Sequence, residues 1–495
     1  MEIRYTSTRD PGVHVKASEA ILSGLSPDGG LFVPEEIPVL GIGLEKIAGM
    51  DYIQTAKLVM SKFLTDFTES ELDECIRCAY DSKFDDPQIA PLKKAGDAWY
   101  LELFHGPTIA FKDMALSILP YLMTTAARKN KENRKIVILT ATSGDTGKAA
   151  LAGFADVPGT GIIVFYPKDG VSPIQEKQMV TQKGDNTCVV GIRGNFDDAQ
   201  SAVKKLFTDP QLGQLLSDNG YRFSSANSIN IGRLVPQIVY YVYVYGRMVK
   251  EGAVKCGDPV NFVVPTGNFG NILAAYYACM MGIPVRKLIC ASNKNKVLYD
   301  FFRTGIYDRN RDFFVTTSPS MDILISSNLE RLLWYLSGCD SSVVAGLMRQ
   351  LSETGRYEIS EAMKEKLSLF FGGYADIEDT QEKMKDLFEK SGYLIDPHTA
   401  VASFVLDKYR EETSDSTPAV IAATASPYKF TQTAGCALGL EETDDFELAD
   451  AISAKTKVPV PTAVESIRTA PVRHRSVVET GMMEKAVTDF LGIKR

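Results

Sequence analysis

The most chemically distinctive residue is Lys112, in the segment FHGPTIAFKDMAL at residues 104–116. Turn-forming residues precede this lysine, and apolar residues flank it on both sides. Apolar surroundings favour the neutral amine of a lysine, which can attack an aldehyde or remove a proton. Because most lysines are solvated cations, this segment alone leaves open an exposed position at the start of a helix.

A second segment with chemical potential is TSGDTGKAA, residues 142–150, which directly follows the apolar run KIVILTA. A strand-to-helix junction presents backbone N–H groups that bind anions. The side chains of Ser143, Thr146 and Lys148 could bind the same anion as these N–H groups. The segment is not a Walker A loop, because Thr142 replaces the required glycine and Ala149 replaces the Ser or Thr after the lysine.

A third segment, GNFGN, lies between the runs NFVVPT and ILAAYYACMMG. It consists of Gly267, Asn268, Phe269, Gly270 and Asn271. The glycines allow close approach of the backbone, and the following helix would direct its N–H groups at a phosphate. The absence of GxGxxG disfavours a dinucleotide, and a tight turn without a ligand remains an alternative for this motif alone.

The elements that must position these segments form an alternating pattern. Short apolar runs, each followed by a helix-compatible stretch, are WYLELF, KIVILTAT, GIIVFYP, TCVVGIR, NFVVPTG, RKLICAS and AVIAATAS. Such alternation predicts an α/β fold with parallel sheets, whose ligands bind where strands lead into helices. We predict an N-terminal helical domain at 1–95, a smaller α/β subdomain at 96–235 and a larger one at 236–495.

Composition narrows the classes of function. The chain has 495 residues, 45% of them hydrophobic, and a net charge of −8, so it is globular and is not expected to bind nucleic acid. The eight cysteines are scattered, which predicts reduced thiols. Cys75 and Cys78 lack further metal-ligand partners, so we expect helix packing and no metal site. Without a signal peptide or a membrane-length apolar run, the chain is predicted to be cytoplasmic.

A lysine amine, a phosphate site and a carboxylate site at strand ends are the parts that a pyridoxal phosphate enzyme assembles. The sequence resembles the threonine synthase family, bacterial and fungal type, within the tryptophan-synthase-β-like (fold type II) group of pyridoxal phosphate enzymes. The resemblance covers almost the whole chain. Its motifs are YTSTRD, SPDGGLFVPEEIP, FHGPTIAFKD, TATSGDTGKAA, GNFGN, SPSMDILISSNLERLL, DPHTAV and TASPYKF.

The resemblance implies a two-subdomain α/β fold with pyridoxal 5'-phosphate as cofactor. Lys112 is expected to form the Schiff base, and the GNFGN loop to bind the cofactor phosphate. Thr424 is expected beside the pyridine nitrogen, and Asp145 near the cofactor ring. Relatives commonly have His in a TAHPAKF segment, whereas this chain has Ser426 followed by Tyr428, so any role of that imidazole does not carry over.

The resemblance also implies the conversion of O-phospho-L-homoserine and water to L-threonine and phosphate, the last step of threonine biosynthesis. The reaction, a γ-elimination followed by β-addition of water, makes the enzyme a carbon–oxygen lyase. Lys112 would remove the Cα proton. Candidate residues for the substrate phosphate are Ser228, Asn230, Arg233, Ser318, Ser326, Ser327 and Asn328. No obligate protein partner is expected.

Three alternatives remain open from the sequence. A phosphohomoserine phospho-lyase would release a keto acid, and a serine or threonine dehydratase or β-replacement enzyme would need no second phosphate site. A catalytically inactive relative is disfavoured by the intact lysine and anion-binding segments. His105 is expected to make a structural hydrogen bond, and the role of His398 is left open.

Overall fold

Two parallel β-sheets organise the chain, for which the computed structural model describes residues 2–142 and 144–494. The larger sheet has the strand order β13-β10-β9-β14-β4-β3, and only β3 runs antiparallel to its neighbour. Its strands are β3 (Leu92–Ala95), β4 (Ala98–Glu102), β9 (Val260–Pro265), β10 (Val285–Ser292), β13 (Phe370–Tyr374) and β14 (Ala419–Ala423). The parallel α/β class predicted from the alternating runs is therefore confirmed.

The smaller sheet is entirely parallel, in the order β15-β7-β6-β5-β8. Its strands are β5 (Lys135–Ala141), β6 (Thr160–Pro167), β7 (Thr187–Arg193), β8 (Tyr221–Ser224) and β15 (Ser476–Glu479). Two antiparallel pairs complete the strands: β1 (Tyr5–Ser7) with β2 (Phe32–Pro34), and β11 (Ile306–Asp308) with β12 (Arg356–Glu358).

Side-chain alternation lets each strand of the smaller sheet pack on two layers of helices. Ile136 and Ile138 of β5 belong to the large core, whereas Val137 and Leu139 join a separate cluster beneath the outer helices. The inner helices are α5 (Asp113–Leu116), α6 (Leu119–Lys129), α7 (Asp145–Phe154) and α8 (Pro173–Val180). The outer helices are α9 (Phe196–Thr208), α10 (Pro210–Asp218) and α22 (Met483–Leu491).

The larger sheet is covered on one face by α11 (Ile231–Lys250) and α12 (Gly270–Met280), and on the other by α18 (Pro397–Thr413). The tyrosine-rich α11 is almost wholly buried. Further helices are α13 (Val297–Thr304), α14 (Leu329–Leu336), α15 (Ser341–Thr354), α16 (Glu361–Glu365), α17 (Ile377–Ser391), α19 (Thr431–Leu438), α20 (Asp445–Thr456) and α21 (Thr462–Arg468). Short 3-10 turns are η1 (Pro319–Met321), η2 (Lys366–Leu369), η3 (Pro427–Lys429) and η4 (Thr480–Met482).

The N-terminal segment contains α1 (Ala17–Ser23), α2 (Leu44–Ala48), α3 (Tyr52–Phe63) and α4 (Glu69–Ala79). Capping boxes begin α3 at Asp51 and α4 at Thr68. Cys75 is buried in α4, in a helix as predicted.

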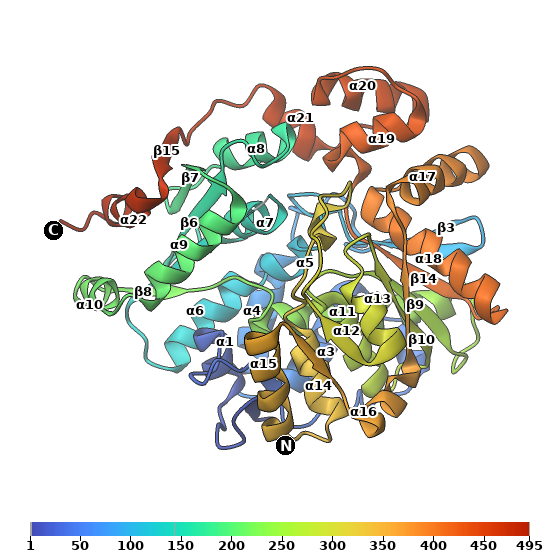
Figure 1. Cartoon of the computed structure of the whole chain (residues 1–495), viewed down its shortest axis with the longest axis horizontal. Helices are drawn as coiled ribbons and strands as arrows, with labels where there is room; N and C mark the ends of the chain where they lie inside the picture. The colour runs from blue at the N-terminus through green and yellow to red at the C-terminus, as the bar shows by residue number, and fades with distance from the viewer. Residues whose placement is uncertain (1, 143, 495) are drawn as a thin grey trace.

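Sheet membership crosses the predicted boundaries at 95/96 and 235/236. Strand β4, which follows residue 96, lies in the larger sheet, and β15, near the C-terminus, lies at the edge of the smaller sheet. Figure 1 shows the C-terminal segment leaving the larger sheet, passing α20 and α21, and ending beside the smaller one. None of the helices in the described part of the chain is both long and apolar enough to cross a membrane.

Candidate active site

Lys112 immediately precedes α5, in the connection that leaves β4. The backbone of this connection is fixed by the segment that follows β14. Ala110 pairs with Ala425, and the N–H of Phe111 donates to the carbonyl of Thr424 at 2.7 Å. Lys112 and Thr424, predicted to face the same cofactor, are therefore carried on paired segments.

The amine of Lys112 is oriented by two oxygen atoms. Its Nζ donates to Ser320 Oγ at 3.3 Å and lies 3.8 Å from Asp145 Oδ2. The Ser320 hydroxyl in turn donates to Asp145 Oδ2 at 2.9 Å. Lysine, serine and aspartate therefore form one hydrogen-bonded cluster, which lies between the 3-10 turn η1 and the first turn of α7.

Burial lowers the pKa of Lys112 to about 8, against an opposing contribution from Asp145. The positive charges of Lys429 and Arg233 also favour the neutral amine. A lysine with this pKa is partly in its neutral form near neutral pH, and the neutral amine is nucleophilic and basic. The solvated-cation alternative considered for this lysine does not fit, since its side chain is only 14% exposed.

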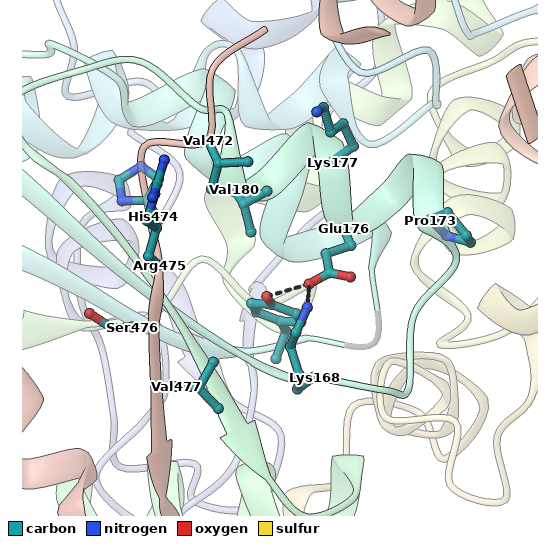
Figure 2. A pocket seen from close by; sticks show the side chains of 11 residues that line it. Lys168, Pro173, Glu176, Lys177, Val180, Val472, His474, Arg475, Ser476 and Val477 are labelled. Atoms are coloured by element: carbon teal, nitrogen blue, oxygen red, sulfur yellow. Dashed lines mark hydrogen bonds and ion pairs between the residues drawn. The ribbon is translucent and has the colours of Figure 1, made fainter. Parts of the chain in front are cut away.

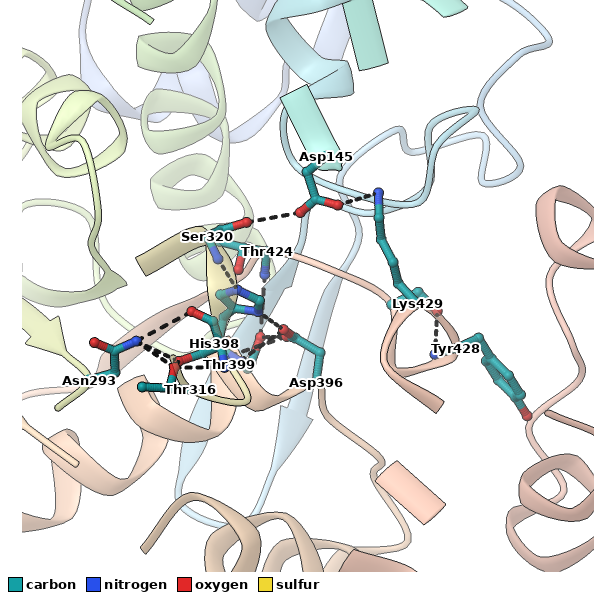
Figure 3. Close-up of polar contacts among 12 residues, drawn as sticks. Asp145, Asn293, Thr316, Ser320, Asp396, His398, Thr399, Thr424, Tyr428 and Lys429 are labelled. Atoms are coloured by element: carbon teal, nitrogen blue, oxygen red, sulfur yellow. Dashed lines mark hydrogen bonds and ion pairs between the residues drawn. The ribbon is translucent and has the colours of Figure 1, made fainter. Parts of the chain in front are cut away.

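Asp145 forms an ion pair with Lys429, whose Nζ lies 2.8 Å from Asp145 Oδ1 (Figure 3). The Lys429 side chain is fully buried and also donates to the carbonyl of Thr108 at 2.9 Å. Burial by itself raises the pKa of Asp145, but Lys429 and Lys112 outweigh it and hold that pKa below its usual range. Asp145 is therefore a carboxylate, and the amide of Gln175 in α8 also donates to it at 3.0 Å.

A buried histidine supports the other side of the cluster (Figure 3). Asp396 lies 2.7 Å from His398 Nδ1, and His398 Nε2 accepts the backbone N–H of Ser320 at 3.2 Å. An accepting Nε2 requires the proton of a neutral ring to be on Nδ1, where it donates to Asp396. His398 thus fixes the turn that presents Ser320 to Lys112, a role that the sequence left open.

The GNFGN loop leads into α12 through Phe269, which adopts a left-handed φ of 66°. A Cβ at Gly267 would lie 2.5 Å from the carbonyl oxygen of Ser320, so this position requires glycine. The loop is held from outside, because Ser326 Oγ donates to the Gly267 carbonyl at 2.6 Å and Asn328 Nδ2 donates to the Asn268 carbonyl at 2.9 Å. Ser326 and Asn328, considered for the substrate phosphate, therefore support this loop.

Asn271 and Arg233 carry buried donors without a partner among the described residues. The hydroxyls of Tyr240 and Tyr241 donate to Asn271 Oδ1 at 2.6 and 2.7 Å, whereas its Nδ2 is unpaired. Arg233 is 2% exposed and donates from Nη1 to the carbonyl of Ala226 at 2.7 Å, whereas its Nε is unpaired. Unpaired buried donors are costly and mark places where a ligand can bind.

The remaining residues predicted to bind the substrate differ in their contacts. Asn230 caps α11 and donates to the carbonyl of Ile21 at 3.0 Å, so its contacts are structural. Ser228 Oγ accepts from Asn328 at 3.3 Å, and Lys148 Nζ donates to Gln182 at 2.6 Å. Thr146 lies in the first turn of α7, beside Asp145. The predicted residue Ser143 lies outside the described residues.

Sequence reasoning missed Lys429, Ser320 and Gln175 as members of the site. The first two occur inside quoted motifs, TASPYKF and SPSMDILISSN, which was the available signal. His105 is structural as expected, since its ring contacts Asp85 and Glu102 at 2.6 and 3.0 Å.

These residues fit pyridoxal 5'-phosphate. A partly buried amine with a lowered pKa can attack a carbonyl carbon, and the glycine-lined start of α12 can bind a phosphate. The free Nδ2 of Asn271 adds an unpaired donor in the same loop. Within residues 2–142 and 144–494, no group of three or more His, Cys, Asp or Glu could hold a metal ion.

Comparison with known proteins agrees with this geometry. The family described as "Threonine synthase N terminus" matches residues 4–80, and "Pyridoxal-phosphate dependent enzyme" matches residues 88–425. "Threonine synthase-like 1" of Homo sapiens is 41% identical over 441 residues, which cover 86% of this chain. The chain spans 58% of the length of that relative. Threonine synthase of Schizosaccharomyces pombe is 37% identical, with 88% of this chain and 90% of the relative covered.

Solved structures show the same relationship. Yeast threonine synthase superimposes with a TM-score of 0.88 at 32% identity, and the PLP-bound threonine synthase of Brucella melitensis with 0.87 at 35% identity. In both cases 99% of each chain is covered. The predicted fold and cofactor are thereby confirmed. This chain belongs to the pyridoxal-phosphate-dependent enzyme family and carries the N-terminal domain characteristic of threonine synthases.

Proposed function

We propose that the chain converts O-phospho-L-homoserine and water to L-threonine and phosphate. The observation that carries this proposal is the buried guanidinium of Arg233. It has an unpaired Nε, and no salt bridge joins it to a carboxylate in the described part of the chain. Burial without an acidic partner lowers the pKa of Arg233 to about 10, which still leaves it cationic at neutral pH.

A buried cation of this kind is stabilised when an anionic ligand binds. We propose that the GNFGN loop and the start of α12 bind the cofactor phosphate. Arg233 is then available to bind a second anion. Arginine binds phosphate oxygens through two parallel N–H groups. A phosphorylated amino acid brings such a group, whereas the substrate of a serine or threonine dehydratase does not. We assign Ser228 to the same subsite because it lies just before the helix that carries Arg233.

Each residue of the site is proposed to have its own role in this reaction. Pyridoxal 5'-phosphate, when bound, supplies the carbonyl to which amines attach and the ring that stabilises negative charge at Cα. Lys112 removes the Cα proton, and Ser320 and Asp145 keep its Nζ oriented through the contacts described above. Thr424 is proposed to contact the pyridine nitrogen, where a hydroxyl favours a less fully protonated ring than an acid would.

The overall exchange of atoms follows from substrate and product. Protons leave Cα and Cβ, the Cγ–O bond breaks with its electron pair moving to phosphate, and Arg233 stabilises the departing charge. Water then adds its hydroxyl at Cβ, and protons return to Cα and Cγ. Thr146, Lys148 and the preceding Ser143 are proposed to bind the substrate carboxylate, and Asn230 to position the phosphate subsite through its cap of α11.

Product analysis tests the proposal. Purified holoenzyme mixed with O-phospho-L-homoserine should release threonine and phosphate in equal amounts. Phosphate with 2-oxobutanoate instead of threonine would favour the second candidate, a phospho-lyase. That candidate is retained because the 41% identical relative is named threonine synthase-like and not threonine synthase. Turnover of serine or threonine with no reaction of the phosphorylated substrate would contradict both.

We also propose a cytoplasmic location. All eight cysteines are free thiols, as expected in a reducing compartment. We propose a small-molecule substrate and no nucleic-acid partner. The net charge of −8 disfavours binding of nucleic acid. Fractionation of the native cells with a cytosolic marker would test it, and recovery with a membrane or secreted fraction would contradict it.

A further inference from the structure

A cavity of about 330 Å³ lies away from the catalytic cluster, between α8, the end of β6 and the segment that enters β15 (Figure 2). The C-terminal segment closes one side, because the backbone N–H groups of Arg473 and His474 donate to the carbonyl of Val180 at 2.8 and 3.1 Å. The cavity thus joins α8 to a segment that comes from the far end of the chain. Its volume lies at the lower end of the range for small-molecule sites, about 300–1,000 Å³.

The charged groups around the cavity are mostly cations. Lys168, Lys177 and Arg475 line it, against the single carboxylate of Glu176. Glu176 is already occupied, since it forms an ion pair with Lys168 and accepts the hydroxyl of Tyr166 at 2.9 Å. Lys177 and Arg475 have no ion-pair or hydrogen-bond partner for their side chains in the described residues.

The rest of the lining is apolar or neutral. Val472 and Val477 line the side formed by the C-terminal segment, and Pro173 and Val180 line the side formed by α8. His474 donates through Nε2 to the carbonyl of Gln182 at 3.0 Å, so this ring supports the wall of the cavity. Two unpaired cations beside an apolar surface are complementary to an anionic head group with a short apolar body.

The same helix reaches the catalytic cluster from its other side. Gln175, next to Glu176 in α8, is buried and donates its amide to Asp145 Oδ1 at 3.0 Å. Ser172 and Gln175 also form the capping box that begins this helix. A ligand that draws Lys177 and the C-terminal segment together therefore acts on the element that holds Asp145.

We propose that this cavity binds a small organic anion, a carboxylate or a phosphate monoester with a short apolar chain, and that its occupancy alters the cofactor site through α8. Coupling between two sites is reciprocal, so the cofactor must change the affinity of the anion by the same factor. The inference concerns the cofactor site and holds whether the product is threonine or a keto acid.

Calorimetric titration of the holoenzyme tests the binding, with butyl phosphate and hexanoate as probes and 1-hexanol as the uncharged control. We expect at least one anion to bind and hexanol not to bind. The double variant K177Q/R475Q should weaken that binding about tenfold or more, the loss expected for charge-assisted hydrogen bonds. The matched control K204Q/K205Q removes two exposed lysines from α9, outside the cavity, and should bind as the native protein does.

The proposed site would be overturned by no binding of either anion, by equal binding of hexanol, or by undiminished binding to K177Q/R475Q. Anion binding at the catalytic cluster gives the last of these results, so the two locations are distinguishable. The relative affinities of butyl phosphate and hexanoate identify the preferred head group. A loss of binding in K204Q/K205Q of the same size would likewise contradict the proposal.

Spectrophotometric titration of the apoenzyme with pyridoxal 5'-phosphate tests the coupling. The bound probe should change the dissociation constant of the cofactor by about fivefold or more in the native protein. Gln175→Ala should retain probe binding but lose this effect, because the contact from α8 to Asp145 is gone. An unchanged cofactor affinity in the native protein would overturn the coupling.

Discussion

Lys429 and Asp145 form a buried ion pair, with 2.8 Å between Nζ and Oδ1, although they lie in the last and the first thirds of the chain. The same amine binds the carbonyl of Thr108, four residues before Lys112. One side chain thus connects the segment that carries Lys112, the first turn of α7 and the segment after β14. The carboxylate that orients Lys112 is therefore positioned by a residue that does not itself contact Lys112.

Replacement of Lys429 should damage both stability and the site. Lys429→Met keeps most of the length of the side chain but leaves Asp145 without its main counter-ion. Breaking a buried ion pair costs about 3–5 kcal/mol, because the remaining charge is uncompensated. Urea unfolding should show a lower free energy of unfolding, and cofactor binding should weaken.

The matched control for this experiment is Lys485→Met. Lys485 pairs with Asp489 on the surface, where both side chains are 61% exposed. Such pairs contribute about 0–1 kcal/mol. If Lys429→Met lost no more stability than Lys485→Met, the Asp145 ion pair would not have the structural role assigned to it.

The reaction of Lys112 with its cofactor should depend on pH. The amine reacts in its neutral form, so the rate at which the apoenzyme binds pyridoxal 5'-phosphate should rise with pH to a midpoint at about 8. Asp145 raises the pKa of Lys112, so Asp145→Asn should move this midpoint to lower pH. Stopped-flow absorbance measures the rate, and Asp85→Asn, which removes a carboxylate that is not among the charges acting on Lys112, serves as control. A midpoint that moves upward would contradict the electrostatic assignment.

His105 should stabilise the fold only below alkaline pH. Burial lowers its pKa, but contacts with Asp85 and Glu102 outweigh this and raise the pKa of His105 to about 9, above the ordinary value of 6.5. The protonated ring is thus favoured in the folded state. Its contribution is complete below pH 6.5 and is lost as the pH rises through about 9.

His105→Gln should therefore cost about 1–2 kcal/mol at pH 6 and close to nothing at pH 10, a cost discounted because Asp85 is largely solvated. Denaturant unfolding at both pH values gives the comparison. His14→Gln, which removes an exposed histidine paired with Glu35, is the control and should have little effect at either pH. A cost for His105→Gln that is the same at both pH values would show that its charge is irrelevant.

Arg233 should matter for the substrate and not for the cofactor. Arg233→Gln should lower kcat/KM for O-phospho-L-homoserine by about 100-fold, the size expected for lost charge-assisted contacts to phosphate. The cofactor absorbance should be unchanged, and the free energy of unfolding should not fall, because an uncompensated buried cation is removed. Arg222→Gln, at a partly buried ion pair with Glu132, controls for loss of an arginine. Loss of the cofactor from Arg233→Gln would place this residue at the cofactor phosphate instead.

The parallel sheets were predictable because buried strands such as Val260–Pro265, in which Asn261 is the one polar residue, and Ala419–Ala423 are apolar runs bounded by turn residues. The edge strand β15 was not, because SVVE is short and mostly exposed. Its membership in the smaller sheet depends on the path of the C-terminal segment, which no local pattern encodes.

The residues of the candidate site were also only partly predictable from the sequence. Lys112 was a candidate because of its apolar flanks and turn residues, and the resemblance to the threonine synthase family pointed to it as the Schiff-base lysine. Lys429, Ser320 and His398 were not assigned roles, because their contacts join segments distant in sequence and depend on the tertiary fold. Asn328 was assigned to the substrate phosphate, whereas the structure shows it supporting the carbonyl of Asn268. A polar residue in a motif is insufficient to distinguish ligand contact from support of a loop.

We expect the amine of Lys112 to carry the cofactor. Two other buried lysines, Lys148 and Lys429, provide the natural comparison. Borohydride reduction of the holoenzyme, followed by proteolysis and mass mapping, identifies the labelled residue. We expect the label on Lys112 alone, and a label on Lys148, on Lys429 or on no lysine would show that Lys112 does not carry the cofactor.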